Sequence, residues 1–453
     1  MDPSVLESHQ SFPVFRVQDG KQKGRLDRIL SVFADVRAGE GAGALLLAAN
    51  AFVLLGAYYV LKTVRDALIL SQFGPVKAAY ASVAQAILLV FLVPAYGAFA
   101  SRVVRTKLIS WVTVFFASHL VVFAALDHAG IRVGAAFYLW LGIVNYLLVG
   151  QFWGFANDLY DEHKGKRLFP LVGMGTATGG VVGAALSTFL FKSLGPYGLM
   201  IAGGAALILS VLLTLTVNHR ESADVGSKQH RIANEPIGRK GGFRLVFTTR
   251  YLFLIAILIL VLNLVNTTGQ NMMNFLANAQ AQSMAGTSRL EFFGRFAGSF
   301  NTMQNLMTMI LQLFIVSRIF RYFGVRAALF VLPAIALGGY ALALALPVFG
   351  LVRAVKVLEN STDYSIQNTA RQALFLPTSR EAKYKAKNAI DTFFTRAGDA
   401  LAGALFIAGT QPWLGLQVRH FAALNVLFVL AWIGLVVAIG REHKRMCAAA
   451  PAP

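Results

Sequence analysis

Apolar windows of about 20 residues recur along the whole chain, and each is long enough to cross a bilayer as a helix. The chain is 56% hydrophobic and only 14% charged. A soluble protein of 453 residues could not bury so much apolar surface in its core. Strands of a membrane barrel would be shorter and alternating, so we expect helices. The eleven windows span residues 44–62, 78–100, 107–126, 133–157, 168–191, 196–217, 250–275, 297–317, 326–347, 388–409 and 419–440.

The net charge of +20 follows mainly from topology. Lys and Arg concentrate in the tails and in alternate loops, such as "SRVVRTK", "EHKGKR" and "SREAKYKAK", as expected for cytoplasmic segments. We therefore expect a multi-pass protein of the inner (cytoplasmic) membrane with both termini in the cytoplasm, the lipid bilayer as its surroundings and no nucleic-acid partner. The first span follows a polar tail and should act as an uncleaved insertion signal. A lone Cys447 excludes an intramolecular disulfide.

The polar segment "RAVKVLENSTDYSIQNTAR" must cross the membrane despite its charges. Basic loops on either side of residues 326–375 place both flanks inside, so one further crossing is required between them. This predicts a twelfth span, tenth in order, over 349–375. In a helix its polar groups fall on one face, which must line water or pair with other helices. Buried ion pairs that only hold helices together are the alternative. The face contains Arg353, Lys356, Asn360, Asp363, Tyr364, Gln367 and Arg371.

Three other spans carry polar faces at helical spacing. The first contains Tyr58, Lys62, Arg65 and Asp66; the seventh contains Asn263, Thr267, Gln270 and Asn274; the eleventh contains Thr392, Arg396, Asp399 and Gly403. Each face has a simpler reading: cations that reach the membrane surface, hydrogen bonds between helices, or an Arg and an Asp that pair with each other.

The fifth span contains a glycine repeat, "GMGTATGGVVGAALS". Its spacing does not fit a dinucleotide fingerprint, and no strand precedes it. Gly175, Gly179, Gly183 and Ser187 are four residues apart, the pattern that lets two membrane helices touch. The sequence also lacks a G-x-x-x-x-G-K-[ST] motif. We expect no enzymatic activity, no catalytic residue, no cofactor and no metal site.

The two halves of the chain resemble each other. The loops "SRVVRTK" and "SRIFRYF", and the loops "EHKGKR" and "EAKYKAK", recur at nearly the same interval. This predicts a cytoplasmic tail at 1–43, a six-helix half at 44–217, a cytoplasmic linker at 218–249, a second six-helix half at 250–440 and a tail at 441–453. The run from Gly97 to Lys107 resembles the loop motif of the major facilitator superfamily. The fold class expected is an all-α membrane protein of about twelve helices.

Four stretches resemble the bacterial and plastid ATP/ADP translocase (NTP/NDP exchanger) family: "LKTVRDALIL", "QFWGFANDLYDEHKGKRLFPLVGMG", "DYSIQNTARQALFLP" and "KAKNAIDTFFTRAGDALAG". The resemblance implies binding roles for Arg65, Asp66, Asp158, Arg371 and Arg396, and it adds Trp153 and Asn157 of the second stretch as candidates. Asp399 and Asp363 stand where the family has Lys, and Asn266 and Gln270 replace an acid and a base.

These observations lead to three hypotheses. The first is an alternating-access exchanger of nucleotides or related organic phosphates, because cations in a low-dielectric cleft attract phosphate. In it Tyr58, Trp153 or Tyr364 could stack on a base. The second is a proton-coupled carrier of another anion or a neutral solute, based on Glu359, Asp363 and Asp399. The third is a sensor or assembly protein on a carrier scaffold. For all three, a small solute is the only partner that the sequence implies.

Overall fold

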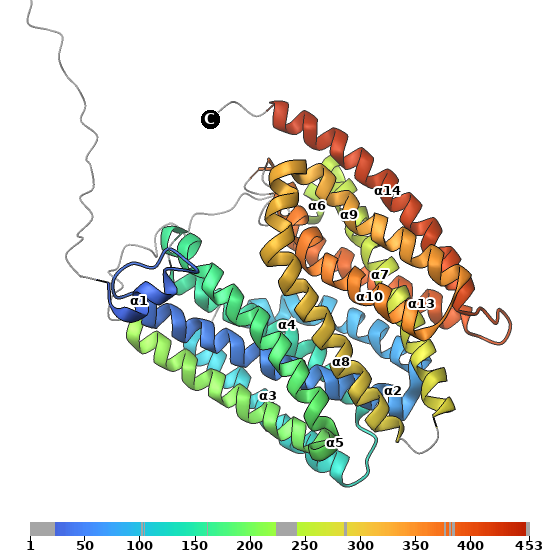
Figure 1. Cartoon of the computed structure of the whole chain (residues 1–453), viewed down its shortest axis with the longest axis horizontal. Coiled ribbons are helices and arrows are strands. Elements are labelled where there is room, and N and C mark those ends of the chain that lie inside the picture. The colour runs from blue at the N-terminus through green and yellow to red at the C-terminus, as the bar shows by residue number, and fades with distance from the viewer. Residues whose placement is uncertain are drawn as a thin grey trace, which may run out of the picture.

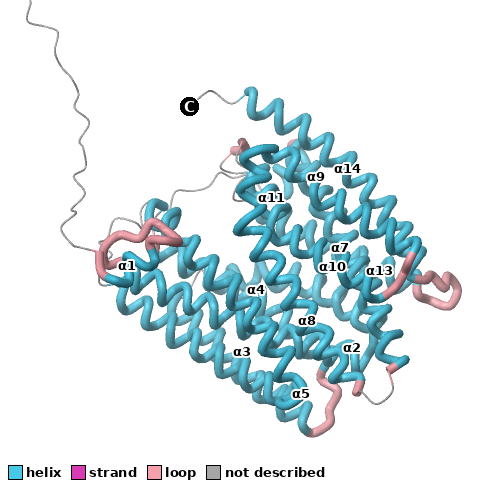
Figure 2. Tube along the Cα trace, viewed as in Figure 1, coloured by secondary structure: helices cyan, strands magenta, loops and turns pink. Residues whose placement is uncertain are grey.

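The computed structural model describes residues 23–100, 103, 105–160, 162–222, 242–284, 288–375, 377–379, 382 and 386–449. Within these ranges the chain is helical, with turns between the helices and no strand (Figures 1 and 2). The elements in the first part are α1 (Arg25–Leu30), α2 (Gly41–Ala100), α3 (Arg105–His128), α4 (Gly134–Leu159), α5 (Glu162–Ser222) and α6 (Gly242–Thr248). Those in the second part are α7 (Arg250–Ser283), α8 (Arg289–Ile310), η2 (Leu311–Val316), α9 (Ser317–Ala345), α10 (Phe349–Thr362), η3 (Asp363–Gln367), α11 (Asn368–Leu374), α12 (Lys387–Ala389), η5 (Ile390–Phe394), α13 (Thr395–Gly409) and α14 (Val418–Ala449).

Seven helices of the described residues are long and apolar enough to cross a bilayer. The expectation of an integral, multi-pass, all-α membrane protein is therefore confirmed. Three of these stretches exceed 50 residues, in the ranges 41–93, 167–220 and 289–345, which is far more than one crossing needs. The count of twelve crossings stays a prediction.

A glycine breaks each of the three long stretches. Gly74, Gly195 and Gly324 have φ angles of 77°, 61° and 73° and are non-helical. Glycine adopts this left-handed region readily because it lacks a Cβ. α2, α5 and α9 are therefore each two helical arms joined at a single residue.

The helices form two groups in space (Figure 1). α2, α3, α4 and α5 pack against one another, and α7, α9, α10, α13 and α14 form the second group. α8 packs against α10 and also against α2 and α5. The predicted domain boundaries remain a prediction, and the structure adds detail to them. α5 extends past residue 217 to Ser222, α6 lies inside the expected linker, and α14 continues past residue 440 to Ala449.

The glycine repeat of the fifth span packs α5 on α2. A Cβ added at Gly175, Gly179 or Gly183 would collide with the backbone carbonyls of Ala48, Phe52 and Gly56. One step further along, Ser187 Oγ donates a hydrogen bond to Thr63 Oγ1 at 2.9 Å. The interpretation of this repeat as a helix-packing surface is confirmed.

The two groups also touch closely. A Cβ at Gly298 of α8 would lie 3.0 Å from Thr188 Cα on α5, and a Cβ at Gly403 of α13 would collide with Val83 on α2. Side chains of α2, α4, α7, α8, α10, η3 and α13 line a polar cavity.

The polar segment of the tenth predicted span is helical throughout. α10, η3 and α11 follow one another without a break from Phe349 to Leu374. η3 is a π-helical stretch, in which each turn holds an additional residue. The helical prediction for this segment is confirmed, while its passage through the membrane stays a prediction because it is too polar to count as a span by composition.

Candidate functional site

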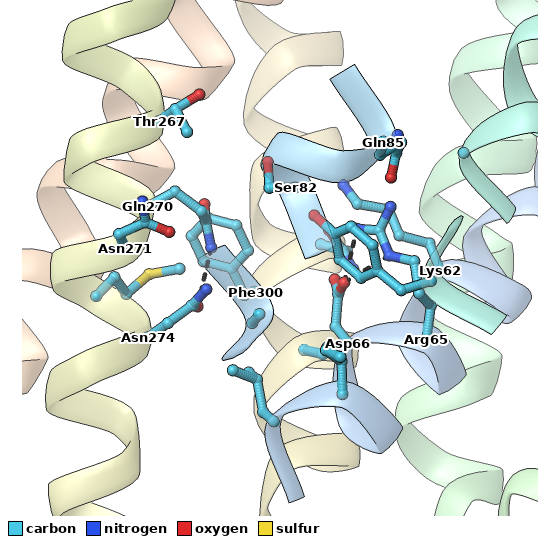
Figure 3. A pocket seen from close by; sticks show the side chains of 18 of the residues that line it. Lys62, Arg65, Asp66, Ser82, Gln85, Thr267, Gln270, Asn271, Asn274 and Phe300 are labelled. Atoms are coloured by element: carbon cyan, nitrogen blue, oxygen red, sulfur yellow. Dashed lines mark hydrogen bonds and ion pairs between the residues drawn. The ribbon is translucent and has the colours of Figure 1, made fainter. Parts of the chain in front are cut away.

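A cavity of about 320 Å³ lies between the two groups of helices. Twelve of the residues singled out from the sequence line it: Tyr58, Lys62, Arg65, Asp66, Asn266, Thr267, Gln270, Asn274, Asn360, Tyr364, Arg396 and Asp399. They come from both groups of helices, so the polar faces of α2, α7, the tenth predicted span and α13 do meet. Figure 3 shows Lys62, Arg65 and Asp66 of α2 on one side and Gln270, Asn271 and Asn274 of α7 on the other.

The charges on α2 are paired within one turn of the helix. Arg65 donates two hydrogen bonds to Asp66 Oδ1, from Nε at 2.8 Å and from Nη2 at 2.6 Å. The guanidinium group also lies 4.6 Å from the centroid of the Tyr138 ring on α4, a cation–π distance. Arg65 is therefore held in place by an anion on one side and a ring on the other.

A second ion pair faces the cavity from α13. Arg396 Nη1 lies 3.0 Å from Asp399 Oδ2. The other oxygen of this carboxylate, Oδ1, accepts a hydrogen bond from Thr267 Oγ1 of α7 at 2.7 Å. Both oxygens of Asp399 are therefore occupied, and the simpler reading of this face, an Arg and an Asp that pair with each other, describes its geometry.

Lys62 is in a different position from the two arginines. Its Nζ lies 5.2 Å from the centroid of the Tyr59 ring. Among the described residues it has no hydrogen bond and no ion pair to a carboxylate. It is thus the cavity cation whose charge is free for a solute.

Carboxamide groups dominate the opposite wall. Gln270 Nε2 donates to Asn274 Oδ1 at 3.1 Å, along the same face of α7. Asn271 is 5% exposed and Asn301 of α8 is 1% exposed. Asn271 Nδ2 and both polar atoms of Asn301 have no hydrogen-bond partner among the described residues. Buried polar groups normally find partners, so these atoms mark places where a solute or water completes the site.

Glycine makes room for one further amide. A Cβ on Gly142 of α4 would collide with the amide group of Gln85, which lies on the second arm of α2. Gln85 Oε1 has no partner among the described residues. Because residue 142 is glycine, this side chain has room to lie at the cavity lining. Figure 3 shows it above the α2 residues.

Only part of the polar face of the tenth predicted span lines the cavity. Asn360 and Tyr364 line the cavity, but Lys356 is fully buried beside it. Lys356 Nζ lies 3.0 Å from Glu359 Oε2 and also donates to the backbone oxygen and Oδ1 of Asn266. Tyr340 donates to the same Glu359 oxygen at 2.7 Å. For Lys356 the alternative of a buried ion pair that holds helices together describes the contacts.

The remaining members of this face also lie outside the cavity lining. Arg353 donates to Ser299 Oγ on α8 at 2.9 Å and lies 5.9 Å from the Phe296 ring centroid. Asp363 and Gln367 are buried in η3, and Arg371 contacts Asn368 within its own helix. For Arg371 the wider turn of η3 is the physical reason, because it rotates the residues that follow it away from the face that a regular α-helix would give.

Four other predicted residues do not line the cavity. Asn263 donates to the backbone of Ile259 within α7. Trp153 packs edge-on against Phe152 and Phe169. Asn157 and Asp158 are exposed at the end of α4. The binding roles assigned to these residues stay predictions without support from the cavity geometry.

Sequence reasoning missed about a third of the polar lining. The additional polar residues are Ser82, Gln85, Tyr138, Asn145, Asn271 and Asn301. Most are isolated amides or hydroxyls in apolar runs, such as Asn145 in "GIVNYLL". A search for lone carboxamides within spans would have found them, since such groups are costly in lipid and must face a partner or water.

The family model and the relatives found by sequence comparison are all ATP/ADP transporters or carriers. The family model described as TLC ATP/ADP transporter matches residues 136–338. The chain is 24% identical to ADP,ATP carrier protein 1 of Chlamydia pneumoniae, with 66% of this chain and 65% of the carrier covered. It is 23% identical to the plastidic ATP/ADP-transporter of Solanum tuberosum, with 68% and 52% covered. The chain thus spans about half to two thirds of the length of these relatives.

Solved structures share the fold. A bacterial homologue of the human lysosomal transporter Spinster, inward-facing and unoccupied, superposes with a TM-score of 0.62 at 14% identity, covering 89% of this chain and 98% of that one. The nucleoside transporter NupG gives a TM-score of 0.58 at 15% identity, with 87% and 98% covered. The expected major-facilitator-like fold is confirmed. These similarities favour neither the proton-coupled carrier nor the non-transporting sensor.

Proposed function

We propose that the chain is a divergent member of the TLC ATP/ADP transporter family and a secondary transporter that exchanges nucleotides or related organic phosphates by alternating access. The family model matches residues 136–338, and 66% of the chain aligns with an ADP,ATP carrier at 24% identity. The solute occupies the cavity between the two helix groups, and no enzymatic step takes part. The protein lies in the inner membrane with both termini in the cytoplasm, as the distribution of basic loops predicts.

The observation that carries this proposal is the lining of the cavity. Three cations, Lys62, Arg65 and Arg396, face a space that is built from both helix groups. A low-dielectric site with fixed cations attracts phosphate strongly. A solute bound here touches both groups at once, so it can stabilise the state in which they change orientation.

Exchange rather than one-way transport follows from the same charges. An empty cavity leaves Lys62 and several amides without partners. The loaded cavity satisfies them, so reorientation costs less with solute bound than without. A carrier with this property moves one solute in as it moves another out.

The test is uptake of labelled adenine nucleotides by proteoliposomes, with and without unlabelled nucleotide inside. We expect uptake that internal nucleotide stimulates. Lys62→Ala removes the unpaired cation from the cavity and should lower uptake by roughly tenfold, since a hydrogen bond to a charged group contributes about 1.5–3 kcal/mol. Lys192→Ala, at an exposed position outside the cavity, is the matched control. Absence of transport for every organic phosphate tried would refute the proposal.

A further inference from the structure

The cavity has little free positive charge for a solute. The cavity lining contains three cations, Lys62, Arg65 and Arg396, and two carboxylates, Asp66 and Asp399. Each arginine is already paired, Arg65 with Asp66 at 2.6 Å and Arg396 with Asp399 at 3.0 Å. Lys62 alone among the described cavity cations makes no ion pair, since the neighbouring carboxylate, Asp66, is bonded to Arg65. The net formal charge of the lining is therefore that of one lysine.

This balance suits a solute with one phosphate group. A single phosphate monoester carries about −1.5 to −2 charges at neutral pH. A di- or triphosphate brings additional negative charge into a site where the arginines are already neutralised. To compensate that charge, Arg65 or Arg396 would have to leave its aspartate, which would then remain unpaired in a partly buried position at considerable cost.

The wall opposite Lys62 suits a ring that both donates and accepts hydrogen bonds. Asn301 of α8 has a free donor and a free acceptor, Asn271 of α7 has a free donor, and both residues line the cavity. A carboxamide that offers both atoms matches the edge of a nucleobase, as Asn and Gln do with adenine. Leaving such groups unpaired in a buried site costs about 1–3 kcal/mol each, so a solute that pairs with them gains affinity.

The size of the cavity points the same way. Its volume of about 320 Å³ is near the lower end of the range of about 300–1,000 Å³ that is typical of small-molecule sites. Lys62 of α2 and the amides Gln270, Asn271 and Asn274 of α7 lie on different sides of it (Figure 3), which fits a compact solute with a phosphate at one end and a ring at the other.

Resting on the transport function proposed above, we infer that this cavity selects a nucleoside monophosphate over the di- and triphosphates, with the phosphate at Lys62 and the base at Asn271 and Asn301. The ion pairs Arg65–Asp66 and Arg396–Asp399 set this preference by withholding both arginines from the solute.

The experiment is equilibrium binding of adenosine, AMP, ADP and ATP to the purified full chain, without divalent cations. These four share one base and differ only in phosphate number. We expect AMP to bind more tightly than the other three by roughly tenfold. If none of the four binds or is transported, the proposed function fails and this inference with it. If ADP or ATP binds as tightly as AMP, the inference alone fails.

Variants separate the two ends of the site. Lys62→Met should weaken AMP binding about tenfold and leave adenosine unchanged, whereas Lys192→Met, an exposed lysine outside the cavity, should change neither. Asn301→Leu should weaken all four ligands alike. An equal loss of AMP and adenosine in Lys62→Met would overturn the phosphate site.

The sharpest test is a gain of affinity. Asp399→Asn releases Arg396 and should raise the affinity for ADP and ATP relative to AMP. Asp66→Asn does the same for Arg65 and provides a second variant if the first unfolds in the thermal scan that checks each protein. If neither change shifts the ranking of the three nucleotides toward ADP and ATP, the ion pairs do not set the preference.

Discussion

Lys356 Nζ and Glu359 Oε2 lie 3.0 Å apart on one turn of α10, and the two side chains are 0% and 2% exposed. Such a pair is stable only as long as both charges are present, because removal of either one leaves the other buried and uncompensated. The surrounding partners, Tyr340 and Asn266, come from α9 and α7. This pair therefore ties three helices of the second group together.

The first prediction concerns this pair. Lys356→Ala should lower the free energy of unfolding by about 3–5 kcal/mol, whereas the double variant Lys356→Met with Glu359→Gln should recover most of it. Thermal unfolding in detergent measures both. A stable Lys356→Ala protein that has lost only solute binding would instead support the binding role that the sequence suggests for this lysine.

The second prediction concerns the seam between α2 and α5. Gly179→Ala places a Cβ against the Phe52 carbonyl, so we expect destabilisation of about 1–3 kcal/mol, as is typical of overpacked sites. Gly173→Ala is the matched control on the same helix, because no atom lies within 4 Å of its added Cβ. Gly173→Ala should be neutral or slightly stabilising, by up to about 1 kcal/mol. Equal melting temperatures for the two variants would contradict this reading of the seam.

The third prediction concerns pH. Burial opposes ionisation of Glu40, but the hydrogen bonds from Arg167 and from the backbone of Arg37 outweigh it and lower the pKa of Glu40 below its ordinary value of 4.5. A lowered carboxyl pKa stabilises the fold above the ordinary pKa, and this contribution disappears as the pH falls through the folded-state pKa. Its two contacts to Arg167 are 2.8 and 2.9 Å long.

Glu40→Gln should therefore lower stability by roughly 1–3 kcal/mol at neutral pH, and the difference from the unmodified protein should shrink as the pH falls below 4.5. Melting temperatures at several pH values measure this. Glu291→Gln is the control, because its ion pair with Arg295 is 3.8 Å long and more exposed. A gap that stays constant with pH would argue against an ionised Glu40 in the fold.

The fourth prediction concerns the contact between α5 and α8. A Cβ at Gly298 would lie 3.1 Å from Thr188 Cβ, close to the separation of about 3.5–4.5 Å found in disulfides. With Cys447 replaced by Ser, the pair Thr188→Cys and Gly298→Cys should form a disulfide on oxidation. If transport requires the two groups to separate here, oxidation stops uptake and a reductant restores it. Full uptake by the cross-linked protein would show that transport does not require α5 and α8 to separate at this contact.

Much of the fold is readable from the sequence because its determinants are local or periodic. Apolar windows predict the helices, and the four-residue repeat from Gly175 to Ser187 predicts the α2–α5 contact that the structure contains. The breaks at Gly74, Gly195 and Gly324 also fall in gaps between the predicted apolar windows, and Gly74 and Gly195 each precede a proline, which is a turn signal.

The site is only partly readable, for two physical reasons. Helical periodicity brings Lys62, Arg65 and Asp66 to one face, but it cannot say whether a buried charge meets a solute or another side chain, as Lys356 shows. The π-helical turn at η3 also shifts the register, so Tyr364 reaches the cavity while Arg371 does not. Lone amides such as Asn301 give no periodic signal at all.

The single-residue turn at Gly74 links the arm of α2 that bears Lys62 to the arm that bears Ser82 and Gln85. Because one residue joins the two arms, the end of the first arm and the start of the second cannot move apart along the helix axes. The solute contacts from these two arms are therefore kept within a short reach of each other at this end, and a longer connector at residue 74 would remove that limit.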